Sequence, residues 1–170
     1  MSNTNHTLET LYFRVTDIWK RFCEEHTLLL DLTFEEYGHL LSSDLGELEQ
    51  ALEKKNVIIK RISNLESMRK ETIKDLNSFL SNSSEEKISD VASLLNYMKK
   101  YEVEKKQKHL FSFNALLVDV IEKLKDQNKK NQLFLNRAIH SLKDIKNSAF
   151  GQKSYSTYNN SGVTKSNIVP

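Results

Sequence analysis

The first part of the chain carries apolar residues at every third or fourth position, which is the spacing of one helix face. This pattern runs from Leu8 to Leu32 and predicts a helix over residues 7–41. The sequence Ser42-Ser43-Asp44 ends it, and Asp44 with Glu47 three residues later has the spacing of a capping box for a following helix. Because the connection is short, we expect the next helix to run antiparallel to the first.

A second apolar stripe predicts a helix over residues 45–80, with charged residues on its opposite face. The stripe consists of Leu45, Leu48, Leu52, Ile59, Ile62, Leu65, Ile73, Leu76 and Leu80. Two helices of about 35 residues are each roughly 50 Å long, which is typical of an elongated hairpin and not of a compact globule.

The serine-rich stretch 81–84 is the clearest break in the chain, and Ser83 with Glu86 again has capping-box spacing. No Gly or Pro occurs between Lys87 and Phe150. A single straight helix of about 60 residues would nevertheless be roughly 90 Å long and would overshoot the hairpin. We therefore predict one helix over 85–98 and a long one over 102–149, with the lysine-rich interval 99–109 as a weak joint or an unsupported arm.

The remaining residues, 152–170, are rich in Ser, Thr, Asn and Gly and predict a disordered tail after a helix-ending Gly151. The fold class that follows is all-α: an elongated antiparallel helical hairpin plus a long third helix, giving a three- to four-helix bundle or coiled coil. Its helical domain covers residues 1–150 and its flexible tail residues 151–170. Composition agrees, because 4 Gly and 1 Pro among 170 residues are too few turn residues for a sheet protein.

The residue types needed for catalysis are present only in scattered positions. The five histidines are far apart without HExxH spacing, and no phosphate-binding or nucleophile motif occurs. The single Cys23 cannot form an internal disulfide, and its neighbours Glu24 and Glu25 raise the pKa of its thiol instead of activating it. We expect no enzyme activity, no catalytic residue, no metal site and no cofactor.

Charge is distributed unevenly behind a formal net charge of +2. Residues 1–53 hold 3 Lys and Arg against 11 Asp and Glu, a net −8, whereas residues 97–147 hold 12 against 6, a net +6. The simpler interpretation is an acidic first helix beside a basic last one. Nucleic-acid binding through Lys99 to Lys108 is the other interpretation, but no RNP-like, zinc-knuckle or helix-turn-helix pattern accompanies the lysines, so no nucleic-acid partner is expected.

Neither a membrane span nor an export signal is expected from the hydropathy of the chain. No stretch approaches the ~20 apolar residues that a spanning helix needs. The first ten residues contain no Lys or Arg and lead into no apolar run. We therefore predict a cytoplasmic protein without membrane insertion.

The last predicted helix carries a heptad seam that two asparagines interrupt. Alternating steps of four and three residues give Leu110, Asn114, Leu117, Ile121, Leu124, Asn128, Asn131, Leu135, Ala138, Leu142, Ile145 and Ala149. Asn128 and Asn131 would open a polar notch beside Leu124, Phe134 and Leu135. One interpretation, which periodicity alone favours, is register control or a water-filled kink; the other is contact with a partner helix laid in the groove.

Three segments resemble the FlgN family of flagellar export chaperones. LLSSDLGELEQALEKKNVIIKRISNLESMRKE, residues 40–71, resembles its helix pair joined near an Asp and followed by Leu-Glu-x-x-Arg, here Leu65, Glu66 and Arg69. LKDQNKKNQLFLNRAI, residues 124–139, resembles its N-x-x-N-x-x-L-L-x-x-x-x-I core. STYNNSGVT, residues 156–164, resembles its Tyr-x-x-x-Gly signature.

The resemblance implies a cytoplasmic type III export chaperone that binds the C-terminal helical region of the hook-associated junction proteins FlgK and FlgL, prevents their premature assembly and delivers them to the export gate. The family's cargo-binding positions match Asn128, Asn131 and Ile139. With the residues around the notch, the expected cargo-binding set is Leu124, Asn128, Asn131, Phe134, Leu135, Ile139 and Leu142.

The resemblance also implies that a tail tyrosine docks the loaded chaperone onto the export gate protein FlhA. Tyr158 holds the matching position. Tyr155 is a rival, because Asn159 follows Tyr158 where the family often has Gly.

The alternative function is a structural coiled-coil module that homodimerises along its helical seams. A chaperone of this kind could also be a homodimer when unloaded. Stoichiometry separates the two functions, because a chaperone is expected to form a 1:1 complex with its cargo.

Overall fold

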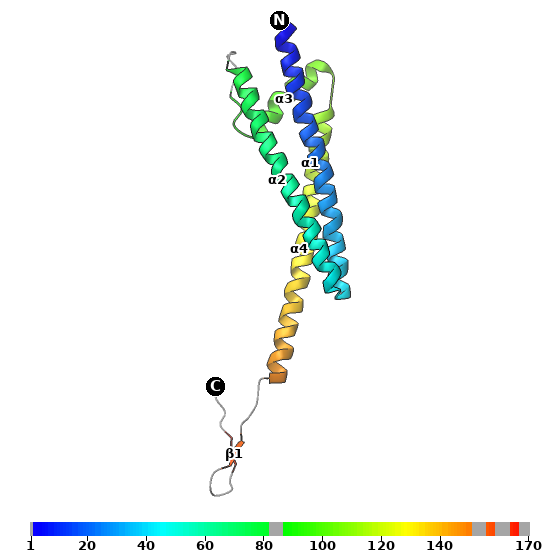
Figure 1. Ribbon diagram of the computed structural model, residues 1–170, viewed down its shortest axis with the longest axis vertical. Coiled ribbons are helices and arrows are strands. Elements are labelled where there is room, and N and C mark those ends of the chain that lie inside the picture. Colours follow the sequence, from blue (N-terminus) through cyan, green and yellow to red (C-terminus); the bar gives the residue numbers. More distant parts are fainter. Residues whose placement is uncertain (1, 82–86, 151–155, 159–163, 167–170) are drawn as a thin grey trace. The chain divides into compact units, whose positions relative to one another are not determined.

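The computed structural model describes residues 2–81, 87–150, 156–158 and 164–166, and these contain four helices (Figure 1). They are α1 (Ser2–Ser42), α2 (Leu45–Leu80), α3 (Val91–Lys105) and α4 (His109–Phe150). The all-α prediction is confirmed. By its contacts the chain divides into two compact units, residues 1–131 and 132–170.

Two short segments of the predicted tail form a two-stranded antiparallel sheet that the sequence did not predict. Strands β1 (Ser156–Tyr158) and β2 (Thr164–Ser166) pair antiparallel, with Tyr158 opposite Thr164. The rest of the tail, and with it Gly151 after α4, lies outside the described residues.

The turn between α1 and α2 follows the prediction closely. α2 has the predicted bounds, and α1 begins earlier than predicted, at Ser2. Ser43 takes a left-handed backbone conformation with φ 57°, and the Asp44 side chain accepts a hydrogen bond from the Glu47 amide at 3.1 Å. This contact supplies an acceptor for one of the unpaired amides of the first helical turn.

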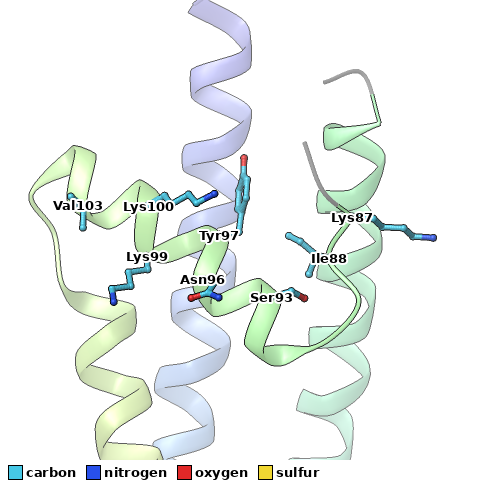
Figure 2. Close-up of a pocket in the computed structure, with 8 residues that line it drawn as sticks. All are labelled: Lys87, Ile88, Ser93, Asn96, Tyr97, Lys99, Lys100 and Val103. Carbon is cyan, nitrogen blue, oxygen red and sulfur yellow. The ribbon is translucent and has the colours of Figure 1, made fainter. Parts of the chain in front are cut away.

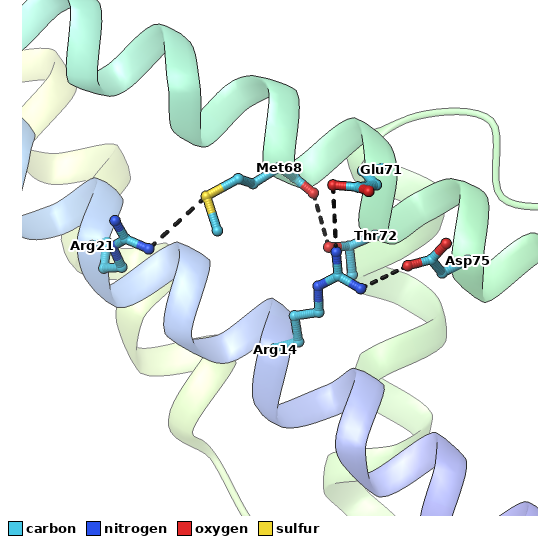
Figure 3. A network of polar contacts seen from close by, with 6 residues as sticks. All are labelled: Arg14, Arg21, Met68, Glu71, Thr72 and Asp75. Carbon is cyan, nitrogen blue, oxygen red and sulfur yellow. Dashed lines mark hydrogen bonds and ion pairs between the residues drawn. The ribbon is translucent and has the colours of Figure 1, made fainter.

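Ion pairs between α1 and α2 show that the two helices run antiparallel. Arg14 lies 2.6 Å from Asp75 and 3.6 Å from Glu71 (Figure 3). Further along α1, Glu25 pairs with Arg61 and Glu36 pairs with Lys55. As the residue numbers rise along α1, those of the partners fall along α2, so the predicted hairpin is confirmed.

Two apolar clusters hold α1, α2 and the other helices of the first unit together. The larger one joins the N-terminal part of α1 to the C-terminal part of α2 and to α3, and contains Tyr12, Trp19, Leu76, Leu94, Met98, Tyr101 and Leu110 among others. The smaller one joins α1, α2 and α4 through Leu29, Leu30, Leu32, Ile58, Val120 and Leu124. The first part of α4 therefore completes the core of the hairpin.

The predicted bounds of the last two helices are wrong by several residues. Instead of 85–98 and 102–149, the helices cover Val91–Lys105 and His109–Phe150. The N-cap of α3 is Asp90, whose side chain forms a capping box with Ser93. The expected Ser83 and Glu86 box lies outside the described residues.

The joint between α3 and α4 falls within the predicted interval 99–109, at residues 106–108. Lys106 adopts the left-handed conformation with φ 54° and ends α3. Across the joint, the buried Glu102 carboxylate accepts hydrogen bonds from the Leu110 amide at 2.7 Å and the Phe111 amide at 3.3 Å. A side chain of α3 thus caps the first turn of α4.

The acidic α1 lies beside α4, as the charge distribution predicted. Trp19 Nε1 donates to Asn114 Oδ1 at 3.1 Å, and further along both helices Asn131 Nδ2 donates to the Thr33 carbonyl at 2.9 Å, so the helices are parallel. Among the residues that the structure describes, however, the ion pairs that α1 makes with another helix all go to α2. Apolar packing and amide hydrogen bonds join α1 to α4.

Candidate functional site

The part of α4 that precedes residue 132 is engaged inside the first unit. Besides Leu110 in its first turn, its buried face consists of Val120, Leu124, Gln127 and Asn131. These positions are four, three and four residues apart, so they share one helix face. The predicted seam is therefore wrong at two steps, because Val120 and Gln127 take the places expected for Ile121 and Asn128.

The Asn131 side-chain amide makes two intramolecular hydrogen bonds, one as donor and one as acceptor. Its Nδ2 donates to the Thr33 carbonyl, and its Oδ1 accepts from Gln127 Nε2 at 2.9 Å. Asn131 is only 3 % exposed. This arrangement corresponds to the first of the two interpretations of the seam asparagines, in which a buried amide fixes how neighbouring helices register.

The expected notch of two adjacent asparagines is not formed in the structure. Asn128 is exposed, because it lies about 100° around the helix from the buried Gln127. Leu124 belongs to the smaller apolar cluster and is 9 % exposed. Of the seven expected cargo-binding residues, Leu124 and Asn131 therefore have roles within the fold.

The second part of α4 carries an apolar face that is open to solvent. We call it the exposed strip and define it as Leu135, Ile139, Leu142 and Ile145, which are 40 %, 41 %, 65 % and 63 % exposed. Steps of four, three and three residues place these side chains on one face of the helix. Single exposed apolar residues are ordinary on protein surfaces, but an apolar row of this length on one helix face is typical of a binding site.

Three of the strip residues, Leu135, Ile139 and Leu142, belong to the expected cargo-binding set. Phe134, another member of that set, is half-buried beside the strip. Ile145 was not in the set, although the heptad steps alone identify it. Leu133 is also 50 % exposed and was missed, because it lies outside the seam.

The two candidate tyrosines for export-gate docking fall in the tail. The backbone of Tyr158 lies in β1 and pairs with Thr164 of β2. Tyr155 lies outside the described residues. The choice between them stays a prediction.

Within the residues that the structure describes, no three His, Cys, Asp or Glu side chains cluster as a metal site would require. Cys23 is buried, and its thiol donates to the Phe113 carbonyl at 3.2 Å. Burial, and to a lesser extent the charge of Glu24, raises the pKa of the thiol. The direction is the predicted one, but burial is its principal cause.

Two lysines of the basic interval, Lys99 and Lys100, line a pocket of about 820 Å³ beside α3 together with Lys87. Figure 2 shows the Lys87 and Lys99 side chains pointing away from each other on opposite sides of this pocket. A phosphate-binding site needs cationic and amide donors that converge on one point. The Lys87 and Lys99 side chains do not converge in this way.

Within the described residues, no helix combines the length and hydropathy that a membrane crossing requires.

An apolar face left uncovered on one long helix is typical of all-α families that bind other proteins. A model of one such family, the FlgN protein, matches residues 11–166. The chain therefore belongs to the FlgN family of flagellar export chaperones and takes part in flagellum biogenesis. No curated protein and no solved structure matched the chain in comparisons of its sequence and fold.

Proposed function

We propose that this protein binds the C-terminal helical region of FlgK, FlgL or both through the exposed strip of α4, and delivers this cargo to the export gate protein FlhA in the cytoplasm. Its action is binding without catalysis. The observation that carries the proposal is the exposure of Leu135, Ile139, Leu142 and Ile145 along one helix face.

The exposed strip has the properties needed to bind a cargo helix and to release it later. Covering four side chains that are about half exposed would contribute on the order of 4 kcal/mol from apolar burial. The loss of translational freedom and side-chain entropy on association opposes this gain at a cost of similar size or larger, so the apolar area that the cargo itself buries must also contribute. The contact can therefore be specific and still be released at the export gate.

The proposal is tested by calorimetric titration of the full chain with C-terminal fragments of FlgK and of FlgL. We expect Ile139→Lys and Leu142→Lys to weaken binding of the cognate fragment at least tenfold, because each places a charge in the contact. The matched control is Val103→Lys, since Val103 is 71 % exposed but lies on α3. Binding by both strip variants at wild-type affinity would refute the proposal.

Docking onto FlhA is the second part of the proposed function, and we assign it to Tyr158. An aromatic ring with a hydroxyl group offers apolar area and a hydrogen bond with few rotatable bonds to restrict. Tyr158→Ala should leave cargo affinity unchanged and weaken FlhA binding by the loaded complex, measured by interferometry, with Tyr155→Ala as the matched control. Loss of docking in Tyr155→Ala alone would assign the role to Tyr155.

The exposed strip also favours self-association, which is compatible with an unloaded chaperone and with the alternative function, a structural coiled-coil module. We propose that the unloaded chain is a homodimer and that cargo converts it to a 1:1 complex. A dimer that persists unchanged in saturating FlgK or FlgL fragment would instead favour the structural coiled-coil module.

A further inference from the structure

The turn between α1 and α2 carries a second exposed apolar surface, in the first unit of the chain. We call it the hairpin tip and define it as Leu41, Leu45, Leu48 and Leu52. Leu41 lies in the last turn of α1 and the other three lie in the first turns of α2, at the end of the hairpin away from the N-terminus (Figure 1). Leu41, Leu45 and Leu52 are 56 %, 75 % and 43 % exposed, and Leu48 is half-buried.

The leucines of the hairpin tip are not needed for packing within the first unit. Leu45, Leu48 and Leu52 are three and four residues apart, so they share one face of α2. The face that α2 buries at this level carries Ala51 and Ile58 instead. Within the part of the chain that the structure describes, neither apolar cluster includes a residue of the tip. An apolar row that a fold leaves uncovered is typical of a surface that binds another protein.

Exposed carboxylates border the hairpin tip on both sides. Glu47 and Glu49 precede and follow Leu48, so they lie about 100° to either side of it on the helix. Glu53 takes the same position after Leu52. All three glutamates are exposed, and none forms an ion pair with another residue that the structure describes. A partner with cations beside its apolar face would therefore find free carboxylates on both flanks.

Cations are absent from this part of the sequence and do not face the hairpin tip from nearby. Residues 22–53 contain nine Asp and Glu and no Lys or Arg. Of the two lysines that follow, Lys54 lines a groove on another face of α2, and Lys55 is largely buried and paired with Glu36. His39, in the last turn of α1, is half-buried. The negative charge at the tip repels nucleic acids and anionic lipids and attracts a basic protein surface.

The geometry points to a basic amphipathic helix of a second partner protein as the occupant of the hairpin tip. Its apolar residues cover the leucines, and its Lys or Arg residues pair with Glu47, Glu49 and Glu53. Helices that dock in this way present anchors three, four and seven residues apart, which is the spacing of the leucines on α2. Complementary charges on the flanks fix the orientation of such a helix and exclude acidic ones.

This inference goes beyond the proposed function and does not depend on it. The hairpin tip belongs to the first unit and the exposed strip to the second, so the two surfaces share no residue. The chain can therefore hold its cargo and the second partner at the same time.

Fluorescence anisotropy of two designed peptides, titrated with the full chain, tests the charge preference of the hairpin tip. The lysine peptide is a helix of about five turns with leucines along one face and lysines on both flanks. The glutamate peptide has Glu in place of every Lys. Wild type should bind the lysine peptide at least tenfold more tightly than the glutamate peptide. Equal affinity for the two peptides, or no binding of either, would overturn the inference.

Substitutions of the leucines test whether the lysine peptide binds at the hairpin tip. Leu45→Lys and Leu52→Lys should each weaken its binding at least tenfold, because each places a cation in the apolar contact. The matched control is Leu116→Lys, since Leu116 is 48 % exposed in the same unit but lies on α4. Binding of the lysine peptide at wild-type affinity by both tip variants would show that it binds elsewhere and would refute the inference.

Charge reversal tests the role of the carboxylates. Glu49→Lys with Glu53→Lys should invert the preference, so that the glutamate peptide binds more tightly than the lysine peptide. Asp17→Lys with Glu122→Lys changes the net charge equally at exposed positions outside the tip and should leave the preference as in wild type. An unchanged preference in the tip variant would contradict the proposed charge pairing.

Cargo titration and sedimentation velocity separate this inference from the proposed function. Leu45→Lys should bind the FlgK and FlgL fragments as wild type does and should leave the oligomeric state unchanged. A loss of cargo affinity would assign the tip to cargo, and a loss of self-association would assign it to a second copy; either result would overturn the inference. Peptide binding at the tip without cargo binding would refute only the proposed function.

Discussion

Glu102 shows how a single buried carboxylate can stabilise the junction of three helices. It is 4 % exposed and accepts hydrogen bonds from the Tyr12 hydroxyl at 2.7 Å and from the Leu110 and Phe111 amides. A buried charge is unfavourable unless such donors replace its water. Lys108, which precedes α4, has no side-chain oxygen that could accept hydrogen bonds from these amides. The Glu102 carboxylate supplies this acceptor from the neighbouring helix.

Tyr12 provides a pH-dependent test of this junction. Burial, reinforced by the hydrogen bond to Glu102, raises the pKa of Tyr12 from 10.0 to about 12. The unfolded chain loses this proton first, so the stabilisation is complete below pH 10 and is lost as the pH rises from 10 toward 12. In urea unfolding, the free energy of unfolding of wild type should therefore fall more steeply over this interval than that of Tyr12→Phe. Parallel pH profiles of the two proteins would contradict the assignment.

The two seam asparagines should differ sharply in their effect on stability. Asn131→Ala leaves the Thr33 carbonyl and the Gln127 amide without their buried partner, which should cost about 1–3 kcal/mol of unfolding free energy. Asn128→Ala changes an exposed side chain and should stay within about 0.5 kcal/mol. Urea unfolding measures both. Equal effects of the two substitutions would show that the Asn131 hydrogen bonds do not stabilise the fold.

At the level of helices, α1 and α2 were predictable because their apolar periodicity and the Asp44 cap agree. The joint between α3 and α4 was harder to place, because it contains neither Gly nor Pro. Lys106 takes a left-handed conformation that the residue type does not favour. The Glu102 carboxylate that caps α4 comes from another helix, and sequence patterns based on local spacing do not reveal such a contact.

The strained backbone at Lys106 leads to a prediction for the joint. Lys106→Gly should raise the free energy of unfolding by up to about 1 kcal/mol, because glycine adopts φ 54° without steric cost. The neighbouring Lys105→Gly should instead lower it by up to about 1 kcal/mol, since Lys105 is still helical as the last residue of α3. Chemical denaturation distinguishes the two. Destabilisation by Lys106→Gly would show that the left-handed conformation is not the one populated in solution.

The candidate site was predictable from the sequence only in part. The heptad seam identified the face of α4 that carries Leu135, Ile139 and Leu142. It could not show where along the helix that face changes its partner, since Leu124 and Leu135 both lie on the seam. Burial separates them, because Leu124 packs against α1 and α2 whereas Leu135 is 40 % exposed.

For the whole molecule, these observations describe a FlgN-family chaperone whose first unit is a packed helical hairpin and whose second unit presents an apolar helix face. The charges of the chain are also divided between its N-terminal and C-terminal parts. Acidic residues predominate in residues 1–53, and basic residues predominate in residues 97–147. Cargo and a second copy would then be alternative covers for one strip.

Hydrogen exchange of the full chain, measured by mass spectrometry with and without the cognate FlgK or FlgL fragment, tests the central claim most directly. The concentration should be low enough for the unloaded chain to be monomeric, so that cargo provides the only cover for the strip. We expect at least tenfold slower exchange of the α4 amides from Leu135 to Ile145 on cargo binding, and little change from Arg14 to Leu29. Unchanged exchange along the strip in a saturated complex would contradict the account.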